Sequence, residues 1–218
     1  MPRDLPTLIA AMTVVAYWIG VITMVAKRRL RYRRSTSGIV PQVAGEQHVW
    51  PLWIAVVTVW IVSPIRAINQ PTGFWSLPTW AMENSYALGV RWGAAVVGLA
   101  GLLATIHCWR RMGRNWSVVV VPGERNELVT SGLFRFVRHP IYALSAVVMA
   151  STAVVVPVWP MVFAVVTHAA LMYYKAHSEE QFLVSLHGHA YVDYRNRTGR
   201  FMPRLVTHVA EPSYRKAA

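Results

Sequence analysis

The stretch Leu128-Val-Thr-Ser-Gly-Leu-Phe-Arg-Phe-Val-Arg-His-Pro-Ile-Tyr142 is a polar, basic turn that runs directly into an apolar segment. That segment continues to Val156, and after Pro157-Val-Trp-Pro160 a second apolar arm, 161–174, leads into the polar block Lys175-Ala-His-Ser-Glu-Glu-Gln-Phe-Leu183. The proline-bounded joint predicts an antiparallel helical hairpin whose two polar feet return to the same side. Charges at the feet of a membrane hairpin are costly outside a protein-lined pocket, so they predict a functional site.

The composition is typical of a membrane protein. Hydrophobic residues make up 55% of the 218 residues and charged residues only 14%, whereas soluble domains average about 25% charged residues. Three further apolar segments, 7–26, 49–68 and 85–109, are each long enough to span a bilayer. The sequence therefore predicts an all-α polytopic membrane helix bundle of about five transmembrane helices. Residues 1–111 supply the first three helices, and residues 112–218 form the core that carries the site.

The distribution of the basic residues predicts the orientation in the membrane. The net charge is +13, and the loop 69–84 contains no Lys or Arg. Nearly all of the 22 Lys and Arg residues fall in three groups: 27–34, 110–138 and 175–216. These groups lie on one side of the predicted topology, which the positive-inside rule assigns to the cytoplasm. We therefore expect an amino terminus outside, a carboxyl terminus in the cytoplasm and contact with anionic lipids of the bilayer. No nucleic-acid motif accompanies the charge, so nucleic acid is not an expected partner.

Several other residues receive simpler interpretations. Arg66 and Arg91, in the second and third predicted helices, are expected to snorkel to the membrane interface. Cys108 is the single cysteine, which excludes an intramolecular disulfide and a cysteine-based metal cluster. The only close histidine pair is His187-x-His189, which is a weak metal signal, and we expect no metal site.

A cofactor site in this chain must be built from helix ends. The chain has no Gly-x-Gly turn and no strand-helix alternation, which excludes a Rossmann-type site. Arg138-His139-Pro140 begins a predicted helix, and the free N–H groups of such a terminus can hold a carboxylate. In the second polar block, Lys175 and Glu179 are four residues apart and share a helix face.

The segment from Met112 to Pro203 resembles the isoprenylcysteine carboxyl methyltransferase family and its phospholipid N-methyltransferase relatives. The elements that carry the resemblance are Gly113-Arg-Asn-Trp-Ser117, Leu128-Val-Thr-Ser-Gly132, Arg138-His139-Pro140, Glu179-Glu180 and Tyr191-Val-Asp-Tyr194-Arg-Asn-Arg197. Members of this family are membrane enzymes that use S-adenosylmethionine. The resemblance implies a cofactor pocket formed by Arg138, His139, Pro140, Tyr142, Glu180, Tyr191, Tyr194 and Arg197. It also implies that Lys175 and Glu179 act on the methyl acceptor.

Two departures from the family pattern concern the acceptor. Lys175 stands where the family has Arg, and Leu144 where it has Gly. Because Lys cannot form a bidentate fork with a carboxylate, this departure weakens the case for a carboxylate acceptor. The sequence leaves open whether the acceptor is a carboxylate, an amine or a thiol. We expect the cofactor to enter from the cytoplasm and a lipophilic or small acceptor to meet it between the last two helices. Glu179 or Lys175 would then help to remove the proton of a thiol or amine.

Other functions remain open at this point. One is a methyltransferase for a phospholipid amine or a small thiol. Another is a membrane reductase that binds a nicotinamide cofactor at a similar place. A third is a non-enzymatic helical bundle such as a small transporter, although the charges cluster at one mouth and do not follow a pore.

Overall fold

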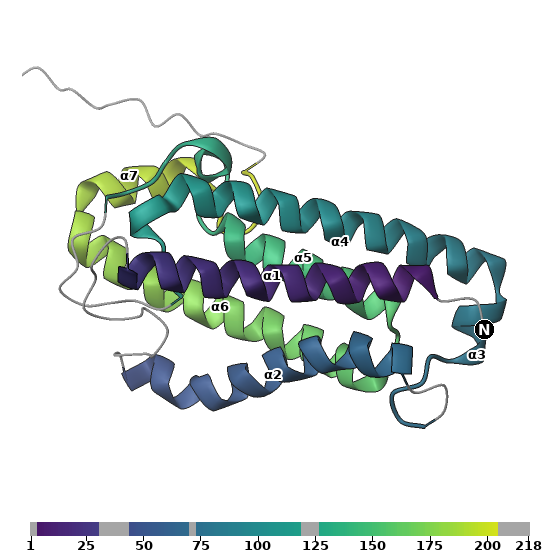
Figure 1. Cartoon of the computed structure of the whole chain (residues 1–218). Helices are drawn as coiled ribbons and strands as arrows, with labels where there is room; N and C mark the ends of the chain where they lie inside the picture. Colours follow the sequence, from purple (N-terminus) through teal and green to yellow (C-terminus); the bar gives the residue numbers. More distant parts are fainter. Residues whose placement is uncertain (1–3, 31–43, 70–72, 119–126, 205–218) are drawn as a thin grey trace, which may run out of the picture.

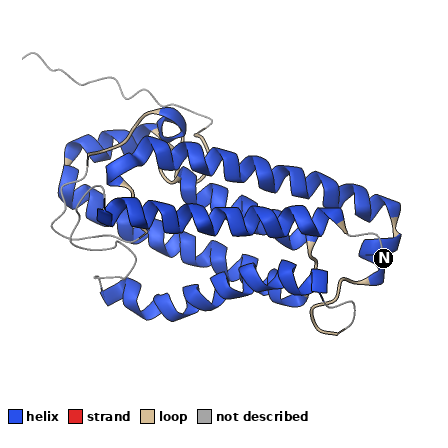
Figure 2. Cartoon of the chain, in the orientation of Figure 1, coloured by secondary structure: helices blue, strands red, loops and turns tan. Residues whose placement is uncertain are grey.

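The structure, a computed structural model, describes residues 4–30, 44–69, 73–118 and 127–204. These residues form an elongated bundle that is almost entirely helical (Figures 1 and 2). The helices are α1 (Leu5–Leu30), α2 (Ala44–Asn69), α3 (Thr79–Glu83), α4 (Ser85–Met112), α5 (Pro140–Val155), α6 (Trp159–His187) and α7 (His189–Arg197). Within the described ranges there is no strand, only a single parallel bridge between Val137 and Gly199. The predicted all-α fold is confirmed.

Helices α1, α2, α4, α5 and α6 run side by side along the axis of the bundle (Figure 1). Helix α7 lies at one end, the α7 end, and α3 lies at the other, the α3 end. A single hydrophobic core includes residues from both parts of the chain, among them Val14, Trp60, Met149 and Met161, all at most 1% exposed. The division at residues 111 and 112 stays a prediction.

Among the described residues, three helices are long and apolar enough to cross a membrane: α1, the segment Gln47–Asn69 of α2, and the segment Ser85–Asn115 that contains α4. Helix α5 is apolar but has 16 residues, which gives a length of about 24 Å against a hydrocarbon core of about 30 Å. Helix α6 is long, but only its first half is apolar. A membrane bundle is therefore supported, while spans by α5 and α6 remain predictions.

Helix ends follow from local sequence. Asn84 accepts a hydrogen bond from the backbone N–H of Ala87 (3.1 Å) and so caps α4. Gly113 and Gly188 adopt positive φ angles of 52° and 55° at the ends of α4 and α6, a region that other residues rarely adopt. Pro160 lies in the first turn of α6, where a missing N–H costs no helical hydrogen bond.

The structure differs from the predicted boundaries in three places. The apolar arm 161–174 and the polar block after it form one continuous helix, because no helix breaker separates them before Gly188. Helix α2 begins at Ala44, five residues before the predicted apolar segment 49–68, so that Pro51 lies inside the helix. The predicted outer loop contains the short helix α3, which the sequence analysis did not anticipate.

The prediction that Arg91 snorkels is wrong, since its side chain is buried at the α3 end with 2% exposure. Its Nε donates to the carbonyl of Val155 (2.8 Å) and its Nη1 to that of Ala81 (3.1 Å). Its Nη2 donates to Thr7 (2.9 Å) and pairs with Asp4. The reason is the shortness of α5, whose last carbonyl groups end inside the protein and need a donor.

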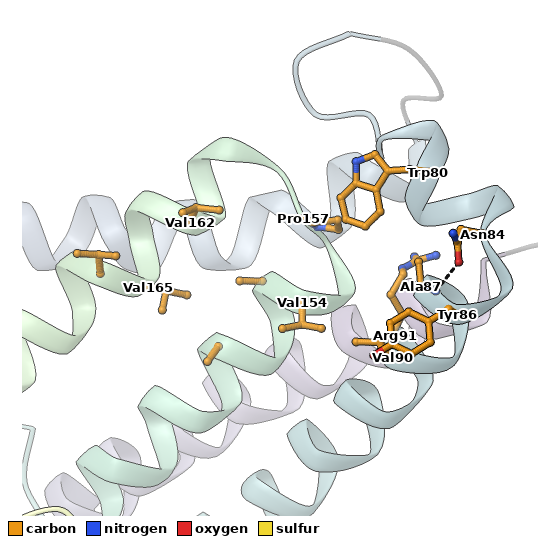
Figure 3. A pocket seen from close by; sticks show the side chains of 13 residues that line it. Trp80, Asn84, Tyr86, Ala87, Val90, Arg91, Val154, Pro157, Val162 and Val165 are labelled. Carbon is orange, nitrogen blue, oxygen red and sulfur yellow. Dashed lines mark hydrogen bonds between the residues drawn. The ribbon is translucent and has the colours of Figure 1, made fainter.

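An open groove of about 660 Å³ lies beside Arg91, between α4 and the α5–α6 turn. Figure 3 shows its valine-rich wall, with Val154, Val162 and Val165 on the side facing Arg91. Arg66 on α2, in contrast, is exposed, as expected for a residue at the interface.

Candidate functional site

A cavity of about 100 Å³ lies at the α7 end, between the end of α4, the turn before α5, α6 and α7. Five of the predicted site residues line it: Arg138, His139, Glu179, Tyr191 and Tyr194. We call it the polar cavity. The two polar feet of the hairpin, about forty residues apart in sequence, thus meet as the hairpin topology predicts.

Glu180 is the centre of an ionic cluster behind this cavity. Its Oε1 lies 2.9 Å from Arg138 Nε and 3.3 Å from His139 Nε2, and its Oε2 lies 2.7 Å from Arg200 Nη2. Glu180 is only 4% exposed. Burial by itself raises the pKa of Glu180, but the contacts with His139, Arg200 and Arg138 outweigh it and hold that pKa well below its ordinary value. The glutamate is therefore an ionised, internal counter-charge.

Arg138 and His139 also hold the segment that follows α7. Arg138 Nη1 donates to the carbonyls of Arg195 (3.0 Å) and Thr198. The backbone N–H groups of Arg138 and His139 donate to the carbonyls of Gly199 (2.8 Å) and Arg200 (3.0 Å). Arg138 thus braces the cavity wall through protein partners. Binding of a carboxylate by this helix terminus stays a prediction.

Arg200 is a part of the cluster that the sequence analysis missed. It holds Glu180 through two nitrogens, Nε at 3.1 Å and Nη2 at 2.7 Å, and lies 5.1 Å above the Tyr173 ring. The hydrogen bond to Glu180 is the main cause that raises the pKa of Arg200. The sequence did contain a signal for this residue. The acidic pair Glu179-Glu180 at a membrane boundary needs basic partners, and Arg200 is a basic residue shortly after the Tyr191–Arg197 element.

Two tyrosines of α7 form the opposite wall of the polar cavity. The Tyr194 hydroxyl donates to the carbonyl of Phe134 (2.6 Å), and burial raises the pKa of Tyr194 to about 12, so that it stays protonated. Tyr191 is 1% exposed, and its hydroxyl has no hydrogen-bond partner among the described residues. Burial raises the pKa of Tyr191 as well. A buried hydroxyl without a partner is unfavourable, so Tyr191 is suited to bond a ligand.

A second cavity of about 70 Å³ lies deeper in the bundle. We call it the aromatic cavity. Six aromatic side chains form a large part of its wall: Tyr17, Trp18, Trp53, Trp60, Trp109 and Trp116. Tyr142, Ser145, His168 and Lys175 also line it. The Lys175 ammonium donates to the carbonyl of Val118 and lies 6.0 Å from the centre of the Tyr142 ring.

The two cavities adjoin each other. Ser117 lines both. Glu179 lines the polar cavity and Tyr142 the aromatic cavity, and the Tyr142 hydroxyl donates to Glu179 Oε2 at 2.8 Å. The Tyr142 ring also stacks on His139, with ring centres 5.3 Å apart. Ser117 and the Tyr142–Glu179 pair therefore form the boundary between the two cavities.

The remaining predicted residues lie elsewhere. Pro140 begins α5 and sets the direction of that helix. Arg197 is exposed, and its Nε donates to the carbonyl of Asp193 (3.2 Å) within α7. Neither residue is among those that line the two cavities. Over the described ranges, no group of three or more His, Cys, Asp or Glu side chains could hold a metal ion.

Comparison with known proteins gives one family and two relatives. The model of the isoprenylcysteine carboxyl methyltransferase family matches residues 94–185. The nickel-cobalt-cadmium resistance protein NccN of Alcaligenes xylosoxydans xylosoxydans is 29% identical over 170 residues, which cover 77% of this chain and 70% of that protein. The cobalt-zinc-cadmium resistance protein CzcN of Cupriavidus metallidurans is 26% identical over 176 residues, with 77% and 69% covered. Residues 94–185 carry the pattern of the isoprenylcysteine carboxyl methyltransferase family, which confirms the resemblance found in the sequence.

Proposed function

We propose that this protein is an integral membrane methyltransferase that uses S-adenosylmethionine to methylate a lipophilic or small acceptor. One observation carries the proposal. The two feet of the α5–α6 hairpin form a polar cavity that adjoins an aromatic cavity across the Tyr142–Glu179 hydrogen bond. This arrangement provides one compartment for a polar cofactor and one for an apolar acceptor, and Ser117 and the Tyr142–Glu179 pair form the boundary between them.

The residues of the polar cavity fit the cofactor. Its sulfonium is cationic, and the carboxylate of Glu179 together with the faces of Phe134 and Tyr194 on the cavity wall can stabilise a cation. The buried hydroxyl of Tyr191 would gain the hydrogen bond that it lacks among the described residues. When bound, the cofactor supplies an activated methyl group.

The protein then has to align the acceptor and exclude water. Holding two reactants in line can contribute about 7–11 kcal/mol to the rate enhancement in favourable cases. We assign Lys175 and Glu179 to the acceptor side. Glu179 takes the proton of a thiol or amine, while Lys175, tied to the Val118 carbonyl, fixes the wall that the acceptor contacts.

We also propose that the α7 end faces the cytoplasm, with the amino terminus outside. The basic last turns of α1 (Lys27, Arg28 and Arg29) and α4 (Arg110 and Arg111) lie at this end. Cysteine labelling in a Cys108→Ser background tests this orientation. In intact cells, an impermeant reagent should modify Glu83→Cys at the α3 end and leave Gln181→Cys on α6 unmodified. The reverse pattern would contradict the orientation.

A labelled-methyl assay tests the function itself. Purified full-length protein is incubated with labelled S-adenosylmethionine and, in turn, membrane lipid extract, small thiols and a prenylated cysteine. We expect transfer to at least one of them. If a reduced nicotinamide nucleotide binds and S-adenosylmethionine does not, the protein is a membrane reductase.

The names of the two relatives favour a role in metal resistance as a second candidate. A role in metal resistance is compatible with methyl transfer, because the first describes what the protein does for the cell and the second describes the reaction. Deleting the protein should then lower growth on cobalt or cadmium. A catalytically impaired Glu179→Gln form should fail to restore that growth if methyl transfer is the cause.

A further inference from the structure

Residues 115–118, which follow the end of α4, form a wall that the polar cavity and the aromatic cavity share. Asn115 lines the polar cavity, Trp116 and Val118 line the aromatic cavity, and Ser117 lines both. Trp116 has extended backbone angles, with φ −70° and ψ 133°. Successive side chains of an extended chain point to opposite sides, which accounts for the alternation between the two cavities. We call residues 115–118 the partition.

A buried arginine of the first helix holds the partition. Arg28 Nη1 donates to the backbone carbonyl of Trp116 at 3.0 Å, although the two residues are 88 positions apart in the chain. Arg28 belongs to the basic last turn of α1, yet it is only 1% exposed. A basic side chain at the end of a membrane helix ordinarily extends toward water, and burial of a charge is costly without polar partners. Arg28 is therefore a part of the protein interior at the α7 end.

The partition has a second anchor on α6. The Lys175 ammonium donates to the carbonyl of Val118, two residues after the carbonyl that Arg28 holds. The Trp116 side chain is 4% exposed, and its ring lies edge-on to Trp109 of α4, with ring centres 6.4 Å apart. Contacts from α1, α4 and α6 thus fix the position of the partition.

From these contacts, and resting on the proposed function, we infer that Arg28 is a positioning residue of the cofactor site. Arg28 is not among the residues that line either cavity, so it acts through the partition. By holding the Trp116 carbonyl it fixes Asn115 and Ser117 on the wall of the polar cavity. A binding wall is effective only when neighbouring contacts hold it in place. Arg28 also lies outside residues 94–185, the part of the chain that matches the family.

Calorimetric titration of S-adenosylhomocysteine into detergent-solubilised full-length protein tests this role. Arg28→Met keeps most of the length of the side chain and removes its donors. We expect the Kd of this variant to rise about tenfold, the effect of one lost hydrogen bond on the position of the wall. Arg28→Lys should bind within about threefold of wild type, because an ammonium can still donate to one carbonyl. Arg28→Gln, which is too short to reach Trp116, should behave like Arg28→Met and replaces it if that variant does not fold.

Arg91→Met is the matched control. Arg91 is also a buried arginine that donates to backbone carbonyls, but it lies at the α3 end. Its loss should lower the melting temperature and leave the Kd for S-adenosylhomocysteine within about twofold of wild type, at a temperature at which each variant is folded. Equal weakening of binding by Arg28→Met and Arg91→Met would show that Arg28 contributes only to stability, and the inference would be overturned.

A double variant tests whether Arg28 and Lys175 hold the same segment. Once one anchor of the partition is lost, loss of the other should add little. The rise in Kd for Arg28→Met combined with Lys175→Met should therefore be clearly smaller than the product of the two single rises. A combined rise equal to that product would mean that the two residues act independently, which contradicts the shared partition.

The outcomes also separate this inference from the proposed function. If the wild-type protein does not bind S-adenosylhomocysteine, the proposed function fails, and the role of Arg28 fails with it. If the wild-type protein binds and the folded Arg28→Met or Arg28→Gln variant binds equally well, only the role of Arg28 is disproved.

Discussion

The Tyr142 hydroxyl donates a 2.8 Å hydrogen bond to Glu179, and this bond connects the wall of the aromatic cavity to the wall of the polar cavity. The neighbouring Glu180 points the other way, into a cluster with Arg138 and Arg200. Two adjacent glutamates on α6 therefore have different contacts. In the proposed function Glu179 takes the proton of the acceptor, whereas Glu180 stabilises the end of the bundle.

Replacing Glu179 should affect turnover far more than stability. Glu179→Gln removes the proton acceptor, and loss of a general base typically lowers kcat by about 10²–10⁴-fold. Its side chain is 28% exposed, so the melting temperature should stay near the wild-type value. Labelled-methyl turnover and thermal unfolding of the same preparation check this prediction. A loss of stability in proportion to activity would show that Glu179 is structural.

Replacing Glu180 should mainly affect stability. Glu180→Ala leaves the buried Arg138 guanidinium without its carboxylate, and breaking a buried ion pair typically costs about 3–5 kcal/mol. We expect a clear fall in the melting temperature, with Glu179→Gln as the matched control one residue away. Equal melting temperatures for the two variants would contradict the separate roles.

The same cluster predicts how stability depends on pH. The pKa of Glu180 is lower in the folded protein than its ordinary value of 4.5. Its ionised form therefore stabilises the fold above about pH 4.5, and this contribution is lost as the pH falls below that value. In detergent, the melting temperature should be nearly constant from about pH 8 to pH 5 and fall at lower pH. Glu180→Gln should show a smaller fall over the acidic range.

Arg91 should be essential for the stability of the α3 end of the bundle. Its guanidinium supplies donors to Val155, Ala81 and Thr7, and a substitution leaves these buried acceptors unpaired at about 1–3 kcal/mol each. Arg91→Met should lower the melting temperature, and Arg91→Lys should rescue it only in part, because Lys lacks the planar fork. Arg66→Met, at an exposed position of α2, is the control. Equal stability of the two Met variants would disprove the role.

The sequence predicted those features that depend on local pattern. The hairpin and its polar feet follow from apolar segments and prolines, and the meeting of Arg138 with Tyr191 and Tyr194 was implied by the family resemblance. The contacts of Arg91 could not be predicted in this way, because Val155 and Thr7 are 64 and 84 residues away in the chain. The aromatic cavity likewise collects Trp18, Trp60 and His168 from three helices. Such groupings depend on how each helix is rotated about its own axis in the bundle. The sequence of an apolar helix with little amphipathic pattern does not determine that rotation.

Calorimetric titration of S-adenosylhomocysteine into detergent-solubilised full-length protein tests the central claim most directly. We predict one-to-one binding, weakened about tenfold in Tyr191→Phe, which removes only the buried hydroxyl at the polar cavity. Arg197→Gln, at an exposed position outside both cavities, should bind as wild type does. Absence of binding to the wild-type protein, or equal binding by wild type and Tyr191→Phe, would contradict the assignment of the polar cavity as the cofactor site.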